Sequence, residues 1–359
     1  MKKILFIVPT LSNGGAENVV ARISSRLVHK GYDVSVLIFY NCEDEYSIDS
    51  KVKIINLSKG KYKEYKKISR INRFYKIRKI VKLLDPNEII PFLDYICLYT
   101  FISLVFTKYI KRLNFTERNN PKYANKKIYL VKKILQIFIK KIILQNKGQQ
   151  SLLTKREKKK SFIIPNPIDD KYFDYQKEMN IRPLHIISIG RLSEQKDYSL
   201  AINAFSKIVK NHPNLTYHIF GKGEDKEKIE NQIKEMNLKE KVILEGFTTD
   251  IDLIYKNADI FLMTSLYEGM PNALAESLAV GIPSISMDCD FGPRDLIENE
   301  QMGILIKDHT VDATVNALSD MIENYNYFSL KAEQRKNIIK SKYSLEKITD
   351  EWIKFIENQ

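Results

Sequence analysis

The amino-acid sequence predicts an α/β protein of two domains, each with a parallel sheet covered by helices on both faces. Short apolar runs alternate with segments in which apolar residues recur every three or four positions, a pattern typical of strands that alternate with amphipathic helices. The alternation occurs twice, before and after a segment with two prolines at 164–174. A chain of 359 residues is too long for one ordinary core and long enough for two.

The first half carries strand patterns at 3–9, 33–39, 52–57, 88–93, 112–116, 142–145 and 161–164, with helical patterns between them at 15–29, 62–84, 96–107 and 124–140. The second half repeats the plan, with strands at 184–190, 215–220, 241–245, 259–263, 283–287 and 303–306. A last helix at 344–357 begins at Ser344, a good N-cap residue. This order of elements predicts two Rossmann-like sheets.

The domain boundary is predicted near Asp169, because the segment IPNPIDDKYFD at 164–174 has the composition of a connection between domains. We expect a first domain at 1–168 and a second at 169–342. A C-terminal helix at 343–359 is expected to pack back towards the first domain.

The apolar run at 89–107 approaches the length of a membrane-spanning helix. Because Pro91 and Asp94 interrupt it, a buried strand that ends at Leu93, a turn and a core helix are the favoured interpretation. The N-terminal run MKKILFIVPT has an apolar stretch of about six residues, too short for a signal peptide, and is interpreted as a strand. The three cysteines have neither disulfide-framework nor metal-site spacing, which favours a cytoplasmic protein.

Charge is divided unevenly between the halves. Residues 1–168 contain 35 Lys and Arg against 12 Asp and Glu, whereas residues 169–359 contain 23 against 32. A positive field on the first half attracts anions, whether phosphates of nucleic acid, anionic lipid headgroups or a diphosphate substrate. A lysine-rich composition throughout the chain is the simpler explanation, but the acidic second half argues against it.

Two loops at predicted strand ends suit a diphosphate. Gly14 and Gly15 open the first helix, where backbone amides and the helix N-terminus favour an anion, although such a turn is often only structural. Arg191 and Lys196 follow the strand at 184–190, and two cations at this edge of a sheet can clamp a diphosphate. A solvated loop would explain these two residues equally well.

The segment SLYEGMPNALAE at 265–276 supports the diphosphate site. Pro271 is predicted as the first residue of a helix, whose first amides would point outward. Glu268 lies just before this helix, and Glu276 lies about one and a half turns inside it. Two carboxylates would repel a phosphate group, so we expect them to bind another part of the ligand. Sugar hydroxyls are the natural candidate, because carboxylates accept hydrogen bonds from them.

Together these motifs resemble those of the family 4 retaining glycosyltransferases, which have the GT-B fold of two Rossmann-like domains facing a central cleft. The resemblance covers nearly the whole chain and lies in GGAE, IPNPID, GRLSEQKD, FGKGED, LEGF, EGMPNALAE and GPRDLIENEQMGILI. Through ERNNP at 117–121 and the ending DEWIKFIEN, it extends to bacterial enzymes that build lipid-linked oligosaccharides or capsules, including N-acetylgalactosaminyl- and hexosyltransferases.

The resemblance implies transfer of a hexose or N-acetylhexosamine from a nucleotide-diphosphate donor, preferably a UDP-sugar, to a membrane-associated lipid-linked saccharide. Arg191 and Lys196 would bind the donor diphosphate, Glu276 the ribose and Glu268 the transferred sugar. The other implied donor-site residues are Gly246 and Phe247, which would meet the base, Gly14 and Gly15, which would face the reaction centre, and Gly269, Asn272 and Ala273 beside the phosphates.

The sequence departs from the family on the acceptor side. Many relatives carry a histidine at the strand end where this chain has Leu93 followed by Asp94, and Arg118 stands where relatives have a histidine after the next strand. Asp94 and Arg118 are therefore candidate acceptor-side catalytic residues, besides Glu268, Arg191 and Lys196. Because no DxD-type metal motif lies at the inferred donor site, no metal is expected, and the cations and helix amides would neutralise the leaving group.

Two basic segments predict docking on the inner face of an anionic membrane. The segment 59–84 has eleven Lys and Arg and one Glu, with an apolar stripe of Tyr65, Ile68, Ile71, Tyr75 and Leu84. The segment 122–141 carries paired lysines between aliphatic runs, namely Lys126, Lys127, Lys132, Lys133, Lys140 and Lys141. Stripes that merely pack on the sheet would explain the apolar residues but not the scarcity of acidic partners.

Two other function classes are compatible with parts of the sequence. A nucleic-acid-binding protein would explain the basic, tyrosine-rich first half, but no RRM, KH or helix-turn-helix signature is present, so no nucleic-acid partner is expected. A nucleotide-sugar epimerase of the same fold would interconvert sugar nucleotides without an acceptor.

Overall fold

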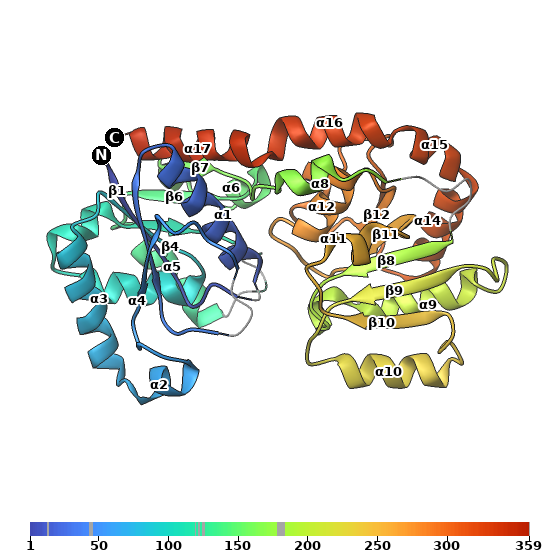
Figure 1. The fold of residues 1–359 in the computed structure, drawn as a ribbon, viewed down its shortest axis with the longest axis horizontal. Coiled ribbons are helices and arrows are strands. Elements are labelled where there is room, and N and C mark those ends of the chain that lie inside the picture. The colour runs from blue at the N-terminus through green and yellow to red at the C-terminus, as the bar shows by residue number, and fades with distance from the viewer. Residues whose placement is uncertain are drawn as a thin grey trace. The chain divides into compact units, whose positions relative to one another are not determined.

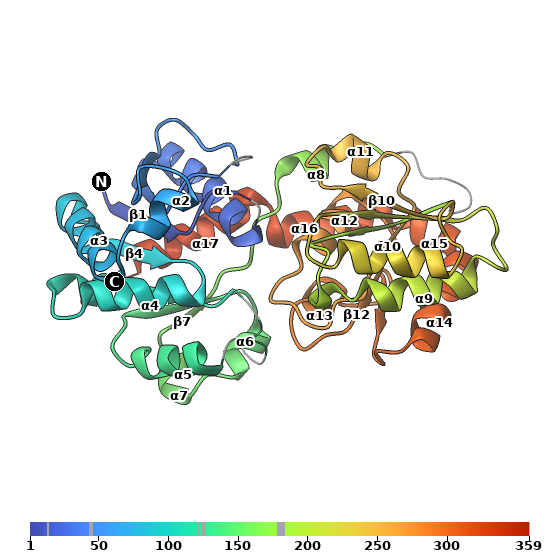
Figure 2. The ribbon, with the colours of Figure 1, turned by 90° about the horizontal axis from the view of Figure 1, so that it is seen from below.

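The computed structural model describes residues 1–12, 14–42, 46–118, 120, 123, 126–177 and 184–358. The chain forms two compact units (Figures 1 and 2): unit 1 comprises Met1–Pro167 and Leu345–Gln359, and unit 2 comprises Ile168–Ser344. Each unit is built on parallel β-sheet with helices on both faces. The predicted α/β fold class is therefore confirmed.

The strands of unit 1 lie in a four-stranded sheet of order β3-β2-β1-β4 and a three-stranded sheet of order β5-β6-β7. A single parallel bridge between Ile89 and Leu113 links β4 to the residue before β5. The strands are β1 (Lys3–Val8), β2 (Asp33–Ile38), β3 (Lys53–Asn56), β4 (Glu88–Pro91), β5 (Asn114–Thr116), β6 (Lys141–Leu144) and β7 (Ser161–Ile163).

The helices of unit 1 follow the predicted spacing with one interruption. The predicted helix at 62–84 is two helices: the first ends at Lys67, with Ile68 as its C-cap, and Ser69 caps the second, accepting a hydrogen bond from the Asn72 amide. The helices are α1 (Gly15–His29), α2 (Tyr62–Lys67), α3 (Arg70–Leu84), α4 (Asp94–Leu104), η1 (Lys108–Arg112), α5 (Lys126–Leu135), α6 (Lys147–Ser151), α7 (Lys155–Lys158) and α17 (Leu345–Glu357).

The run 89–107 forms the end of β4 and then helix α4, as predicted. Across the described residues, we find no helix with both the length and the hydropathy that a membrane crossing needs.

Both faces of β1 are buried, which is why its sequence is continuously apolar. Phe6 packs on one face with Trp352 of α17, their ring centroids 5.7 Å apart, whereas Leu5 and Ile7 belong to the core on the other face. Trp352 is fully buried. The last helix of the chain therefore completes the core of unit 1.

Unit 2 has one six-stranded parallel sheet of order β10-β9-β8-β11-β12-β13. Its strands are β8 (His185–Ile189), β9 (Thr216–Phe220), β10 (Val242–Gly246), β11 (Ile260–Met263), β12 (Ser284–Met287) and β13 (Ile304–Ile306). Its helices are α8 (Asp170–Asp174), η3 (Glu194–Lys196), α9 (Tyr198–Ile208), α10 (Lys226–Glu235), α11 (Ile251–Tyr255), α12 (Asn272–Val280), α13 (Pro293–Leu296), α14 (Val311–Glu323), α15 (Tyr325–Leu330) and α16 (Ala332–Tyr343).

Candidate functional site

The strand order of unit 2 marks one place in its sheet where a ligand is expected. β8 and β11 are neighbours, but β8 leads on to β9 and β10 on one side whereas β11 leads on to β12 and β13 on the other. The loops that follow these two strands therefore diverge, and in open α/β sheets ligands bind in the crevice at this switch point, at the carboxyl ends of the strands. Arg191 and Lys196 lie in the loop after β8, and Glu268 lies in the loop after β11.

Lys196 and Glu268 form an ion pair at this point, with 2.5 Å between Nζ and Oε1. The side chains are 18% and 8% exposed, so the pair is largely shielded from water. Arg191 is exposed, and within the described chain its guanidinium has no hydrogen-bond partner. A shielded cation, a carboxylate and an uncommitted arginine thus occupy the predicted diphosphate and sugar site.

Hydrogen bonds hold the two loops together beneath this ion pair. The Leu266 amide donates to the carbonyl of Gln195 at 2.8 Å, and the Gln195 side-chain amide donates to the carbonyl of Tyr267, also at 2.8 Å. The Thr264 hydroxyl donates to the carbonyl of Lys196 at 3.0 Å. Gln195 and Thr264 were not predicted as site residues, because the sequence shows no sign that the two loops meet.

The FGKGED turn lies directly against the loop of Arg191. A Cβ atom added to Gly221 would lie 1.8 Å from the carbonyl oxygen of Gly190, and one added to Gly223 would lie 2.2 Å from that of Leu192. The Leu192 amide also donates to the carbonyl of Lys222 at 3.1 Å. Only glycine permits this approach of two backbones, which explains why the motif accompanies the Arg191 loop.

Helix α12 differs from the prediction in its first residue. Pro271 is the N-cap, with extended backbone angles, rather than the first helical residue, and the helix begins at Asn272. Asn272, Ala273 and Glu276 are all half-buried, and Gly269 is buried just before the helix. The helix N-terminus follows Glu268 by a few residues and adds a partial positive charge near the ion pair.

The residues implied for base binding lie after β10. Gly246 has a φ of 77° and accepts a hydrogen bond from the Gly221 amide at 2.7 Å. Phe247 is 46% exposed, and the Lys222 ammonium lies 4.6 Å from its ring centroid. The carboxyl end of β10 lies at the same edge of the parallel sheet as the ends of β8 and β11.

In unit 1 the glycine turn is faced by a carboxylate of the chain itself. Gly14 is the N-cap of α1, and a Cβ atom added there would lie 1.9 Å from Oε2 of Glu17, which is buried. Gly15 is the first helical residue, while Asn13 lies outside the described residues. Glu17 thus lies over the turn where the sequence suggests an anion.

The two acceptor-side candidates lie in different surroundings. Asp94 is the first residue of α4 and pairs with Lys132. Arg118 is buried, donates from Nη1 to Oδ1 of Asn166 at 3.0 Å, and lies over the ring of Phe92 at 4.3 Å. Burial lowers the pKa of Arg118 to about 9. Asn119 and Pro121 of the ERNNP motif lie outside the described residues.

The predicted membrane lysines are corrected in part, because two are not on the surface. Lys132 is fully buried in ion pairs, and Lys141 is buried with its Nζ donating to the carbonyls of Phe355 and Asn358 at the end of α17. Lys140 pairs with Glu88 at 2.9 Å, and Lys133 with Glu157 at 3.5 Å. Lys126 and Lys127 are exposed; residues 122, 124 and 125 of this segment lie outside the described residues.

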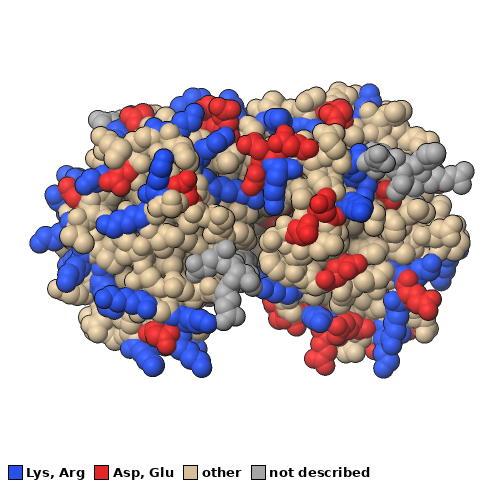
Figure 3. Space-filling view, in the orientation of Figure 1, with Lys and Arg blue, Asp and Glu red and all other residues tan. Residues whose placement is uncertain are grey.

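Helix α5 turns one of its predicted surface lysines inward and several apolar side chains outward. While Lys132 lies inside, five apolar side chains along the same segment are exposed by 45% to 63%: Leu130, Val131, Ile134, Ile137 and Phe138. Of the apolar stripe predicted along 59–84, Ile71 and Tyr75 are exposed, whereas Tyr65, Ile68 and Leu84 are half-buried. Helix α3 packs through Ile77 and Val81, and contact of the stripe with a membrane stays a prediction. Figure 3 shows many Lys and Arg side chains on the visible face of unit 1.

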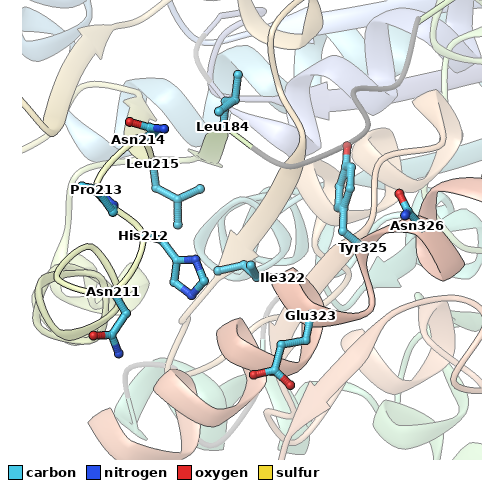
Figure 4. Close-up of a pocket in the computed structure, with 10 residues that line it drawn as sticks. All are labelled: Leu184, Asn211, His212, Pro213, Asn214, Leu215, Ile322, Glu323, Tyr325 and Asn326. Carbon is cyan, nitrogen blue, oxygen red and sulfur yellow. The ribbon is translucent and has the colours of Figure 1, made fainter.

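A separate cavity of about 440 Å³ lies at the opposite edge of the unit 2 sheet (Figure 4). Leu184 and Leu215, which line it, come just before β8 and β9. His212 and Tyr325 also face it. Its lining contains none of the predicted site residues.

Comparisons with known proteins identify what this chain is similar to. Residues 173–344 match the family described as Glycosyl transferases group 1. An uncharacterized glycosyltransferase of Haemophilus influenzae is 26% identical over 358 residues, covering 98% of this chain and 99% of that protein. The Campylobacter jejuni GalNAc-α-(1→4)-GalNAc-α-(1→3)-diNAcBac-PP-undecaprenol α-1,4-N-acetyl-D-galactosaminyltransferase is 26% identical over 367 residues, covering 99% and 98%.

The fold is similar to that of a solved structure of a mutant TarM from S. aureus in complex with fondaparinux, α-GlcNAc-glycerol and UDP. The TM-score is 0.82 over 99% of this chain and 100% of the other, at 16% sequence identity. At this identity the likeness concerns the fold alone.

Proposed function

Since this chain is a glycosyltransferase of the GT-B fold with a group 1 domain, we propose that it transfers a hexose or N-acetylhexosamine, with retention, from a UDP-sugar to a lipid-linked saccharide. The acceptor class is proposed from the named Campylobacter relative, which matches along nearly its whole length. The donor nucleotide is proposed from the UDP in the TarM structure and from the site in unit 2.

The observation that carries the proposal is the ion pair of Lys196 and Glu268 at the switch point. Arg191 lies in the same loop as Lys196 and is exposed, without a hydrogen-bond partner among the described residues. A UDP-sugar offers each partner a new ligand: its diphosphate suits the two cations, and the hydroxyls of its sugar suit the carboxylate. In this proposal the donor separates the pair, and the α12 amides add a further contact to phosphate. Glu276 binds the ribose hydroxyls.

The leaving group is a nucleoside diphosphate, which gains negative charge as the glycosidic bond breaks. Arg191, Lys196 and the α12 N-terminus supply positive charge at the place where this develops, so we propose that transfer needs no metal ion. Addition of EDTA should leave the rate within about twofold, whereas a strict requirement for Mg²⁺ would contradict this part of the proposal.

We further propose that the protein works at the cytoplasmic face of a membrane and docks there through α5. On a water-facing helix the polar residues normally point outward, but on α5 Leu130, Val131 and Ile134 are exposed together with Lys126 and Lys127. Apolar side chains that enter the headgroup region, flanked by lysines, are the arrangement of interfacial helices. Such docking would hold the enzyme beside a lipid-linked acceptor.

The test is a transfer assay with a panel of UDP- and GDP-sugars and an undecaprenyl-diphosphate-linked saccharide. We expect one UDP-sugar to give a lengthened product, whose anomeric configuration by NMR matches that of the donor. Interconversion of the sugar nucleotide without acceptor would identify an epimerase instead. An inverted product would leave a glycosyltransferase but exclude retention.

A further inference from the structure

A buried lysine in unit 1 holds two carboxylates at the carboxyl edge of the sheet. Lys132 has a fully buried side chain. Its Nζ donates to Asp94 Oδ1 at 2.5 Å, to Glu117 Oε2 at 3.0 Å and to the Thr116 carbonyl at 2.8 Å. An ammonium group has three donors, so all of them are in use, and the lysine fixes both carboxylates at once.

The position of Asp94 corresponds to the ligand position of an open sheet. In the sheet order β3-β2-β1-β4, the chain passes from β1 to β2 on one side of β1, whereas β4 lies on the other side of β1. The loops after β1 and β4 therefore flank the switch point of this unit, where ligands bind. Gly14 lies in the first of these loops, and Asp94 ends the second.

The backbone before Asp94 is held in an unusual conformation. Leu93 has a φ of 73° and a ψ of 146°, a region that side chains of its size rarely adopt and that persists only where the surroundings fix it. The Leu93 carbonyl accepts a hydrogen bond from the Cys97 amide at 3.0 Å, which closes the first turn of α4. Such strain is characteristic of functional loops, and here it directs the next residue.

The two carboxylates held by Lys132 differ in their second oxygen. Oε1 of Glu117 is sealed from solvent and has no hydrogen-bond partner in the described part of the chain, and burial raises the pKa of this carboxyl. The Asp94 side chain is 16% exposed, and within the described residues its Oδ2 has no hydrogen-bond partner. Among the described residues, the cluster therefore leaves Asp94, which is partly exposed, with an acceptor oxygen that makes no hydrogen bond.

We propose that Asp94 is the residue of unit 1 that binds a hydroxyl group of the acceptor sugar, and that Lys132 is its positioning residue. The hydroxyl donates to Oδ2, while Lys132 holds Oδ1 and so fixes the direction of the carboxylate. This inference rests on the proposed function, since it requires a saccharide acceptor. It gives Lys132 a role in transfer in place of the membrane contact expected from the sequence.

The decisive variant is Asp94→Asn, which keeps the shape of the side chain and leaves Lys132 paired with Glu117. We expect kcat/KM for the acceptor to fall roughly ten- to a hundredfold. KM for the donor, UDP affinity and acceptor-independent hydrolysis of the donor should not change, because these belong to unit 2. Glu117→Gln is the matched control, and its acceptor kinetics should stay near wild type.

Lys132 is tested in two ways, because Lys132→Met alone would leave two buried carboxylates without a partner and risk misfolding. The double variant Lys132→Met/Glu117→Gln removes one charge of each sign and should lose acceptor kcat/KM about as far as Asp94→Asn, again without change in donor KM. Adding Asp94→Asn to it should lower acceptor kcat/KM little further, because the two residues act as one.

Wild-type acceptor kinetics in Asp94→Asn would overturn the whole inference, whether or not the double variant folds. Wild-type acceptor kinetics in a folded double variant would overturn the role of Lys132. If the wild-type protein transfers no sugar to any acceptor, the proposed function itself fails, which is a different result from transfer that is indifferent to Asp94.

Discussion

Lys196 and Glu268 are 72 positions apart in the chain, yet their side chains meet at 2.5 Å. They come from loops after neighbouring strands whose connections run to opposite sides of the sheet. Each residue therefore shields and orients the other before any ligand binds. A variant that removes one of them also changes the surroundings of the other, so the contributions of the two cannot be read from single substitutions alone.

Substitutions of the two glutamates of the proposed donor site should differ in their effect on UDP binding. Glu276→Ala should weaken both UDP binding and transfer, because the ribose is part of UDP. Glu268→Ala should lower transfer by roughly tenfold or more while UDP still binds, since its proposed ligand is the sugar. Calorimetry with UDP and a transfer assay measure both effects, with circular dichroism as the control for folding. Normal turnover in either variant would refute its assignment.

Arg191→Ala should weaken UDP and UDP-sugar binding alike. Loss of a charge-assisted contact to phosphate costs about 1.5 to 3 kcal/mol, or roughly ten- to a hundredfold in affinity. Lys207→Ala is a matched control, because this lysine is 53% exposed on α9 and, among the described residues, pairs with the exposed Asp312 alone. The UDP affinity of this variant should be unchanged. An Arg191 variant that binds UDP as tightly as wild type would remove this residue from the diphosphate site.

Membrane docking should depend on the outward face of α5. We expect co-sedimentation with anionic vesicles that falls as salt rises, since each lysine near the surface contributes about 1 kcal/mol. Lys126→Glu/Lys127→Glu and, separately, Ile134→Glu should each reduce it. Leu253→Glu is the control, because Leu253 is 67% exposed but lies in unit 2. Equal binding of all variants, or equal binding to neutral vesicles, would exclude α5 as the docking surface.

Gly223→Ala should destabilise unit 2, because the added methyl group would lie 2.2 Å from the Leu192 carbonyl and force the two backbones apart. Overpacking of this kind costs about 1 to 3 kcal/mol, which thermal unfolding would detect. Gly31→Ala separates crowding from backbone strain: Gly31, unlike Gly223, has a left-handed φ of 88°, but nothing lies within 4 Å of the added atom. Wild-type thermal stability in Gly223→Ala would show that crowding at the FGKGED turn is not the reason for its glycine.

The strands and their order in the chain could be predicted from the sequence, because each is a short apolar run bounded by polar or turn residues. The orientation of α5 could not. Its lysines and aliphatic residues fit an ordinary surface helix, and only the carboxylates of Asp94 and Glu117, 38 and 15 positions away, draw Lys132 inside. Pairing between distant residues is set by the tertiary fold, which local periodicity does not report.

The sequence singles out the residues of the proposed donor site one by one, but does not show how their loops meet. Arg191, Lys196 and Glu268 stand out by charge and position at strand ends. The contacts of Gln195 and Thr264 that join their loops use ordinary polar residues and backbone carbonyls, and these have no distinguishing pattern in one sequence.

The placement of Trp352 in unit 1 bears on how the chain folds during synthesis. Residues 168–344 are made after the strands of unit 1 and before the helix that fills their core. At ordinary rates of translation, roughly ten to forty seconds pass in between. During that interval the face of β1 that Phe6 occupies lacks its tryptophan, so the nascent first unit has an exposed apolar surface on the ribosome, which is a natural target for chaperones.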